Sequence, residues 1–433
     1  MRAWLGVAFP IVLASVMLPG IAAAQQLGPR TSIVSDEFRD RLSERGRNES
    51  VRQRGRPEYD PAGIRLGGFT AFPVIDLEVY STDNLLRSES DELAALGLNT
   101  RLGSTIRSTW SVHELSVAGS VGYNQNNELS SENITTIDLN GSGRLDISRG
   151  RNLQGQVRFS RGAEPRGSSG SVTDSKSPIE FDQHGATTGL LWEFSRLRFA
   201  ARADTQTFDY KDGQSLTGTV IDQSERDRTQ NTLTGRVEYA QSPSIAWYGE
   251  IAANERAYDV SSTTARDSTG VSVLVGSSFD ITGLTRGEIG VGYISQNYDK
   301  TIYEDQAGLG VRAAVEWFPS RRVTLAGTVS RTIDDSAIVN SGSIISTAYG
   351  VQADYEFRRN IIVTGRAQLV NADYSGLARK DKTTDLSLSA AYLLNRTAAL
   401  SFFVTNSALS SSGAQFGPKF AETRVGVRLT LRR

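Results

Sequence analysis

From residue 67 to the C-terminus, apolar and polar residues alternate with a period of two. The alternation is strict in Ile75-Asp76-Leu77-Glu78-Val79, recurs in Leu197–Arg202 and Leu309–Trp317, and closes the chain in Arg424–Leu431. Successive side chains of a strand point to opposite faces, so each segment has one apolar face and one polar face. The pattern predicts about 18 strands, at roughly 20 residues for each strand with its connection.

Short and long connections alternate between these segments. Transmembrane strands need about 9–11 residues, and outer-membrane barrels combine short periplasmic turns with long external loops. The rhythm therefore predicts an all-β fold, a transmembrane antiparallel β-barrel of about 18 strands over residues 67–433, in the bacterial outer membrane. The expected short turns lie near residues 111–112, 148–152, 195–196, 241–244, 281–284, 319–322, 358–360 and 395–397. The expected long loops include residues 81–93, 162–178, 211–227, 259–268, 334–343, 375–381 and 410–419.

Aromatic residues cluster at both ends of the predicted strands, as expected for rings at two water–lipid interfaces. Those beside the long loops are Tyr80, Tyr123, Phe159, Tyr210, Tyr258, Tyr293, Tyr298 and Tyr374. Those beside the short turns are Trp110, Trp192, Phe194, Tyr239, Phe279, Trp317, Phe318, Tyr355, Phe357 and Tyr392. A repeat of about 40 residues also suits a β-propeller, but a blade packs four short strands into that length. A soluble β-sandwich is the other alternative, and it would need neither an export signal nor two aromatic bands.

The chain before the strands divides into two parts. Residues 1–24 carry a basic Arg2, an apolar stretch and small residues before Gln25, which predicts a secretory signal peptide cleaved after Ala24. The alternative, a membrane anchor, would need about 20 apolar residues. Residues 25–66 contain too few large apolar residues to bury a core, so we expect a polar periplasmic arm. Its arginines could contact an anionic polymer or a partner, but we expect a solvated linker balanced by acidic residues. These arginines are Arg45, Arg47, Arg52, Arg54 and Arg56.

The composition excludes several kinds of site. The chain has no cysteine, which excludes disulfides, iron–sulfur clusters and cysteine nucleophiles, and its net charge of −1 gives no basis for nucleic-acid binding. With only His113 and His184 available, we expect no metal site and no cofactor. A hydrolase using one of these histidines is the enzyme alternative, but the expectation is that the protein is not an enzyme. The G-x-G-x-x-A match at Gly308–Ala313 lies inside a predicted strand, which argues against a dinucleotide site.

The entry into the first strand carries a resemblance to a known family. Residues 54–69 contain Arg56-Pro57-Glu58-Tyr59-Asp60-Pro61-Ala62-Gly63, followed by a strand and then Asp83-Asn84. This segment, together with the turn Trp317–Arg322, resembles the putative β-barrel porin 2 family of Gram-negative outer-membrane proteins. The resemblance implies a barrel linked with surface-polysaccharide production. The chain departs from the usual aromatic C-terminus of such barrels by ending in Leu431-Arg432-Arg433, which bears on recognition by the barrel-assembly machinery.

The polar face of the strands carries charges of both signs. A charge on the lipid face costs about 2–4 kcal/mol at the midplane, so these residues are expected to face the lumen. The candidate lumen-lining residues are Arg101, Arg144, Arg158, Arg202, Asp204, Arg236, Glu238, Glu250, Arg312, Glu316, Asp354, Arg366 and Arg428.

A barrel of this size can leave an aqueous channel, unless loop 162–178 or loop 211–227 folds inward and closes it. We therefore expect a porin-like channel for hydrophilic solutes that serves polysaccharide export. The alternatives are a non-conducting accessory barrel of an export complex and, less favoured, an outer-membrane hydrolase. The expected partners are outer-membrane lipids, the barrel-assembly machinery, and polysaccharide or its export proteins, with no nucleic acid.

Overall fold

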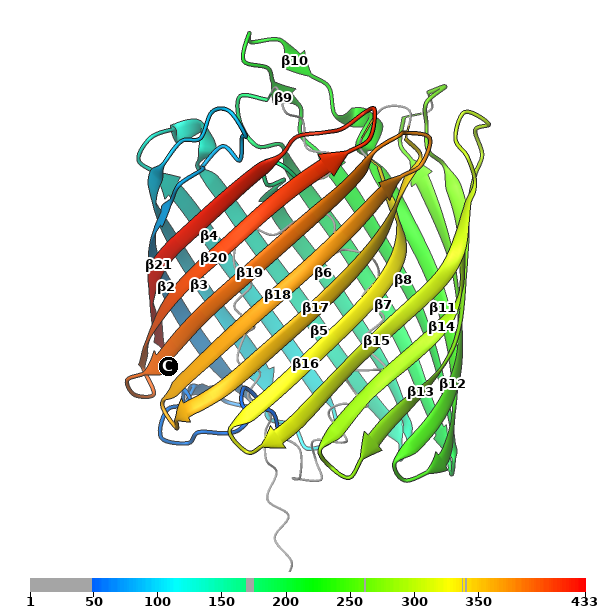
Figure 1. Cartoon of the computed structure of the whole chain (residues 1–433). Coiled ribbons are helices and arrows are strands. Elements are labelled where there is room, and N and C mark those ends of the chain that lie inside the picture. The colour runs from blue at the N-terminus through cyan, green and yellow to red at the C-terminus, as the bar shows by residue number, and fades with distance from the viewer. Residues whose placement is uncertain (1–48, 169–174, 261, 337, 339–340) are drawn as a thin grey trace, which may run out of the picture.

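The computed structural model is a closed, strongly tilted β-barrel (Figure 1). It describes residues 49–168, 175–260, 262–336, 338 and 341–433. The predicted signal peptide, residues 1–24, and residues 25–48 of the predicted arm lie outside the described residues. Among the described residues, no helix is long and apolar enough to cross a membrane.

The wall consists of β2–β8 and β11–β21, and this confirms the prediction of about 18 strands. The first half contains β1 (Ile64–Leu66), β2 (Phe69–Thr82), β3 (Ala95–Ser108), β4 (Glu114–Asn126), β5 (Ile134–Ser148), β6 (Arg151–Ala163), β7 (Glu180–Phe194), β8 (Leu197–Tyr210), β9 (Gly213–Gln214) and β10 (Val220–Ile221). The second half contains β11 (Arg228–Ser242), β12 (Ile245–Tyr258), β13 (Ser268–Ile281), β14 (Thr285–Tyr298), β15 (Gln306–Ser320), β16 (Val323–Asp335), β17 (Ser343–Arg358), β18 (Ile361–Tyr374), β19 (Lys380–Leu393), β20 (Ala398–Ser412) and β21 (Phe420–Arg432). The 3₁₀ turns are η1 (Ser130–Glu132) and η2 (Ser224–Arg226).

Antiparallel pairing of sequential neighbours builds the wall, and β2 closes it. One edge of β2 pairs with β3, from Phe69↔Ser108 to Thr82↔Ala95. The other edge pairs with β21, from Val74↔Arg432 to Thr82↔Arg424. The first and last strands of the barrel are therefore joined, as closure in a membrane requires.

Short turns and long loops lie at opposite rims of the barrel, as the connection rhythm predicts (Figure 1). The eight short connections fall at the expected positions, and both described chain ends lie at the short-turn rim. The long-loop rim also holds residues 127–133 and 299–305, which the sequence analysis did not single out. The long loop 211–227 carries the separate hairpin β9–β10.

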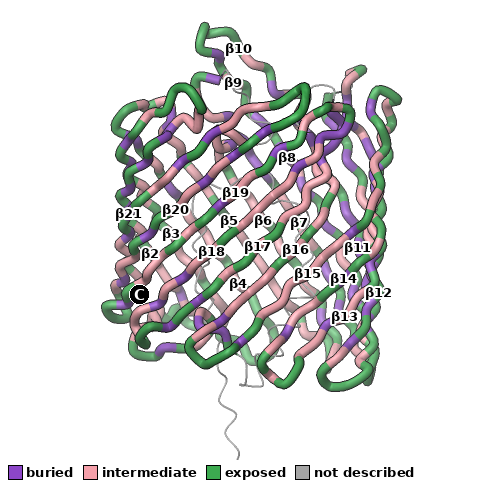
Figure 2. The backbone as a smooth tube through the Cα atoms, viewed as in Figure 1, coloured by how far each residue is buried: buried purple, intermediate pink, exposed green. Residues whose placement is uncertain are grey.

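The two faces of the wall differ as the alternation predicts (Figure 2). Large apolar side chains such as Val157, Leu233 and Val351 point outward and are about three-fifths exposed, at 62%, 62% and 61%. Their neighbours on the same strands, including Thr232, Thr234 and Glu356, are buried on the inner face. An apolar outer band facing lipid and a polar inner face are the arrangement of membrane barrels.

The aromatic band at the short-turn rim is present on the outer face. Trp192, Tyr239, Trp317 and Tyr355 are all exposed there. Phe318 is an exception, because it turns inward and packs under the Arg286 guanidinium, 5.2 Å from its ring centroid.

The predicted aromatic band at the long-loop rim is largely wrong. Tyr123 and Tyr293 are exposed on the outer face. Four other tyrosines of the set are buried on the inner face, because they share the strand parity of the inward charged residues. These are Tyr80, Tyr210, Tyr258 and Tyr374.

We expect a charge to be tolerated on one face of mid-strand β6 and not on the other. Val157→Arg should lower the free energy of unfolding by about 2–4 kcal/mol, because the guanidinium would face hydrocarbon. Gln156→Arg, one residue away on the inner face beside Asn140, is the matched control and should cost much less. Urea unfolding in lipid vesicles measures both variants. Equal losses would show that the two faces are assigned incorrectly.

Candidate functional site

The thirteen candidate lumen residues all lie on the inner face of the wall. Arg236 and Glu238, for example, are buried there, whereas Val237 and Tyr239 between and beside them are exposed outside. The structure gathers Arg236, Glu238, Glu250 and Arg312 into one cluster. The remaining candidates lie elsewhere on the inner wall: Arg101 on β3, Arg144 on β5, Arg158 on β6, Arg202 and Asp204 on β8, Glu316 on β15, Asp354 on β17, Arg366 on β18 and Arg428 on β21.

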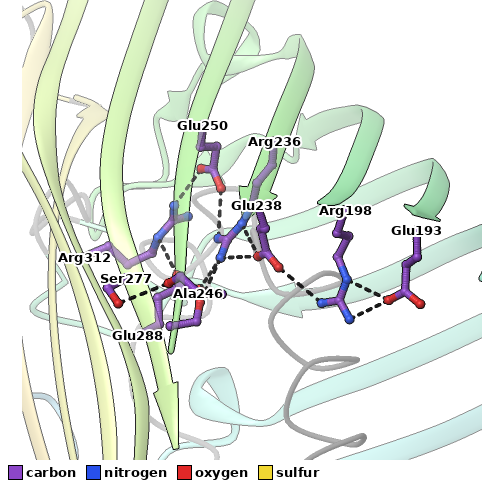
Figure 3. A network of polar contacts seen from close by, with 10 residues as sticks. Glu193, Arg198, Arg236, Glu238, Ala246, Glu250, Ser277, Glu288 and Arg312 are labelled. Atoms are coloured by element: carbon purple, nitrogen blue, oxygen red, sulfur yellow. Dashed lines mark hydrogen bonds and ion pairs between the residues drawn. The ribbon is translucent and has the colours of Figure 1, made fainter. Parts of the chain in front are cut away.

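An ion-pair cluster centred on Arg236 runs along the inner wall from β11 to β15 (Figure 3). The Arg236 guanidinium lies 2.6 Å from Glu238, 3.3 Å from Glu250 and 2.7 Å from Glu288. Glu250 also accepts from Arg312 at 2.6 Å. Glu288 on β14 lies three strands from Arg236 on β11, so these side chains lie along the concave wall.

Glu193 and Arg198 extend the cluster to β7 and β8. The Arg198 guanidinium lies 2.7 Å from Glu193 and 3.3 Å from Glu238 (Figure 3). Glu193 was missed as an inner residue by the sequence analysis. The strand alternation could have predicted its inward position, since Trp192 and Phe194 on either side both point outward.

The cluster is shielded from water, and its members depend on one another. The side chains of Arg236, Glu238 and Glu250 are 3%, 5% and 6% exposed. The Tyr248 ring lies against the Arg236 guanidinium, 3.7 Å from ring centroid to Cζ. Removing one partner of such a buried group leaves an uncompensated charge, which costs about 3–5 kcal/mol.

The other candidates make shorter-range contacts on the same face. Arg202 pairs with Asp204, and Arg428 pairs with Glu78 on β2. Glu316 receives the Arg286 guanidinium at 2.6 Å. The remaining contacts are as follows: Arg144 lies 3.2 Å from Asp146, Asp354 accepts from Thr364 at 2.6 Å, Arg366 donates to Gln352 at 2.8 Å, and Arg101 donates to Ser120 at 2.8 Å.

A cavity of about 700 Å³ lies in the lumen on the long-loop side of this cluster. Its charged lining is mixed but more basic than acidic. The basic residues are Arg87, Arg228, Arg256, Arg312, Arg331 and Arg366, and the acidic residues are Glu250, Asp334, Asp335 and Asp385.

The described part of loop 162–178 folds inward over this cavity. Pro165, Gly167 and Ser168 contribute to the cavity lining. Arg166 holds the loop, because its guanidinium lies 2.5 Å from Glu132 in η1 and its Nη1 donates to the Ser175 carbonyl at 2.9 Å. The loop therefore narrows the long-loop mouth, one of the two outcomes that the sequence analysis left open.

A second ion pair joins this loop to loop 211–227. Arg226 of η2 pairs with Glu164, donating from Nη1 at 3.0 Å. Burial acts against the charged form of Arg226, but the Glu164 carboxylate outweighs it and raises the pKa of the guanidinium. The Arg226 guanidinium therefore stays charged in its contact with the other loop.

The inward tyrosines pack against arginines of the loops at the long-loop mouth. Arg226 lies over the Tyr210 ring, 3.9 Å from its centroid, and Arg379 lies over Tyr374 at 4.5 Å. Contacts of this kind stabilise a desolvated arginine by about 2 kcal/mol. Rings expected at the lipid interface thus stabilise charged loop residues inside the mouth.

At the short-turn rim, residues 50–60 line the inner wall, which corrects the expectation of a solvated linker for this part of the arm. Val51 is fully buried against Ile362, Leu393 and Ala399, and its amide donates to the Thr324 hydroxyl at 2.9 Å. This segment narrows the second mouth.

Two arginines of the predicted linker anchor the same segment. Arg54 and Arg56 both contact Glu356 of β17, at 3.1 and 2.8 Å. Arg56 is only 3% exposed and also donates to the Val51 carbonyl at 2.8 Å. Sequence gave no signal for this burial, since Val51 stands alone among polar residues.

The other sequence motifs lie away from the cavity. His113 accepts from the Asp146 amide at 3.2 Å, and His184 packs against Phe159 with ring centroids 5.1 Å apart. The segment Gly308–Ala313 lies within β15. In the described part of the chain, no three or more His, Asp or Glu side chains group into a potential metal site.

We expect Arg236→Met to lower the free energy of unfolding by about 3–5 kcal/mol, because three buried carboxylates lose their shared partner. Arg101→Met is the control, since Arg101 is exposed in the lumen and donates to the neutral Ser120 hydroxyl. It should cost under about 1 kcal/mol. Urea unfolding followed by tryptophan fluorescence distinguishes the variants, and equal midpoints would contradict the role of the cluster.

Comparison with known proteins gives a family. The model of the family described as Putative beta-barrel porin 2 matches residues 56–433. No curated protein matches the chain in sequence. Solved structures similar to the chain include a mutant of the ferric enterobactin receptor PfeA of Pseudomonas aeruginosa, at 8% identity and a TM-score of 0.45, covering 83% of this chain and 80% of that chain. The copper transporter OprC is another, at 8% identity and a TM-score of 0.45, covering 86% of this chain and 81% of that chain. The siderophore receptor PiuA of Acinetobacter baumannii is a third, at 8% identity and a TM-score of 0.46, covering 86% of this chain and 82% of that chain.

The match begins at Arg56, in the segment that lines the short-turn mouth, and continues through every strand of the barrel. The resemblance seen in residues 54–69 and in Trp317–Arg322 is therefore confirmed over the whole barrel. The chain belongs to the putative β-barrel porin 2 family.

Proposed function

We propose that the protein is a channel for hydrophilic solutes in the outer membrane of a Gram-negative bacterium. The observation that carries the proposal is the cavity of about 700 Å³ inside a closed, lipid-facing wall, lined by charged and hydroxyl side chains. Barrels of this strand number are wide enough to leave an aqueous path. The role is transport and involves no chemical step.

The charge of the lining favours weak anion selectivity. Six arginines and four carboxylates face the cavity. A ring of one sign would give strong selectivity, whereas a mixed lining gives a modest preference for the sign in excess. Anions should therefore pass somewhat more easily than cations of the same size.

Polysaccharide export is the finer form of this proposal, and its support is the family resemblance alone. Sugars carry many hydroxyl groups, and the cavity offers Gln230, Thr328 and Gln368 beside its charged residues. Swelling of proteoliposomes in neutral oligosaccharides of increasing length measures whether such chains pass. If even disaccharides do not pass through the loop-release and arm-release variants described below, the channel carries only smaller solutes.

Release of the inward loop should raise the single-channel conductance. In planar bilayers, Arg166→Gln with Glu164→Gln removes the contacts of the loop with Glu132 and Arg226, so the loop no longer narrows the mouth. Arg161→Gln is the matched control. Arg161 lies near the end of β6, the strand that leads into this loop, but it pairs with Asp182 on the outer side of the wall. The control should conduct like the unmodified protein.

Release of the arm is the second half of this experiment. Arg56→Gln with Val51→Asp removes the buried contacts of residues 50–60 and should open the short-turn mouth. If the folded protein stays silent with both the loop and the arm released, the channel proposal fails. The accessory-barrel alternative would then stand.

Orientation can be tested by labelling, since the chain contains no cysteine. Leu216→Cys, on the exposed β9–β10 hairpin, should react with a membrane-impermeant maleimide on intact cells. Arg196→Cys, in the short turn between β7 and β8, should react only after the cells are broken. The reverse result would place the long loops in the periplasm.

A further inference from the structure

The barrel wall is split between β15 and β16 at its long-loop end. The two strands pair from Val311↔Arg331 downward. Above this point Gln306–Gly310 pairs with β14, and Thr332–Asp335 pairs with β17, but neither segment pairs with the other (Figure 1). By contrast, β13 and β14 pair without a break from Ser268↔Tyr298 to Ile281↔Thr285.

A lumen side chain contacts the separated edge of β16. Arg256 of β12 donates from Nη2 to the Ile333 carbonyl at 2.6 Å. A backbone carbonyl without a partner inside a membrane wall costs several kcal/mol, so this contact stabilises the separated edge. Arg256 thus supports the separated end of β16 from the lumen side.

Arg331 lies at the base of the split and reaches toward the opposite edge. Its Nη2 lies 4.0 Å from the position that a Cβ on Gly308 would occupy. Gly308 and Gly310 leave this part of β15 without inward side chains. The base of the split is therefore bordered by a guanidinium on one side and bare backbone on the other.

The inner side of the split presents unused hydrogen-bond donors. Arg256 is only 6% exposed, and its Nε and Nη1 have no acceptor; the same holds for Nε of Arg331. Both residues line the lumen cavity. Asp334 and Asp335 are the acidic groups near Arg256, and Asp335 is also held by other residues.

Those other residues saturate Asp335 and leave the site basic. Arg228 and Arg266 lie 3.7 and 3.6 Å from its carboxylate, and the Tyr258 hydroxyl donates to it. Four arginines therefore surround two aspartates. Buried guanidinium nitrogens without acceptors favour an added carboxylate or phosphate.

The outer side of the split is apolar. Leu309 is 57% exposed on the lipid face of β15, whereas Ile333 of β16 lines the lumen cavity. Inside, Leu274 and Ile294 line the adjoining cavity. A molecule lying across the split would meet basic groups at one end and apolar groups at the other.

We propose that the split between β15 and β16 is a lateral portal. It binds an amphipathic molecule whose acidic head lies at Arg256 and Arg331 and whose acyl chain extends between the strand edges into the outer leaflet. The proposal goes beyond the aqueous channel and is independent of it, because ion conductance and acyl-chain binding are separate measurements.

Paired cysteines test whether the split exists. Ala313 and Val329 are directly opposed in the paired part of β15 and β16. If the same register continued into the split, Leu309 would lie opposite Ile333. Directly opposed strand residues lie about 5.5 Å apart, within the range of a disulfide. Under mild oxidation in vesicles, Ala313→Cys with Val329→Cys should form the bond. Leu309→Cys with Ile333→Cys should not, but should be bridged by a longer bis-maleimide. Equal disulfide formation in the two pairs would overturn the portal.

Photolabelling tests the ligand. A diazirine-bearing palmitate, added to the full-length protein in vesicles, should attach to β15 or β16 near the split, as mapped by mass spectrometry. Arg256→Gln with Arg331→Gln should reduce this labelling at least fivefold, whereas Arg161→Gln on the opposite part of the wall should leave it unchanged. Labelling spread evenly around the barrel, or unaffected by the arginine changes, would overturn the proposal even if the channel conducts.

Discussion

Every backbone amide and carbonyl in a membrane wall must find a partner, and this requirement governs the molecule. It makes β2 pair with both β3 and β21, which closes the barrel. Closure then makes the alternation of side chains separate lipid from lumen, so charge in the middle of the wall lies on the inner face. The exception is informative: where β15 and β16 do not pair, Arg256 supplies a donor to the Ile333 carbonyl. The polar lumen thus stabilises the one long interruption of pairing noted in the described wall.

Charges forced onto one concave face must then be stabilised by one another. Around Arg236 they are, because three carboxylates share its guanidinium and are themselves shared by Arg312 and Arg198. Such a cluster stiffens the wall but leaves few donors for a solute. Buried ion pairs contribute little net stability, while the loss of one member is costly. Its value therefore lies in keeping the short-turn half of the wall rigid rather than in binding.

The sequence predicts the features that follow from the alternation of side chains along a strand. It does not predict the features that depend on contacts between segments far apart in the chain. The strands, the turns and the inward position of all thirteen candidate residues follow from the period of two. The inward position of Tyr80 could have been predicted, because Tyr80 lies two residues after Glu78 on the same strand and therefore on the same face. The burial of Val51 and Arg56 had no sequence signal, because it depends on β16–β20 meeting a segment far away in the chain. The end of pairing at Val311↔Arg331 is likewise a property of two strands together.

These contacts divide the lumen into two zones with different roles. In the short-turn half, the Arg236 cluster and the segment 50–60 use their charged groups on each other and on Glu356. In the long-loop half, Arg228, Arg256 and Arg331 keep nitrogen atoms without acceptors beside the cavity. We therefore expect a solute to be recognised in the half nearer the long loops, where these three arginines line the cavity. The inward loop at Arg166 lies over that same zone, so it covers these arginines as well as narrowing the mouth.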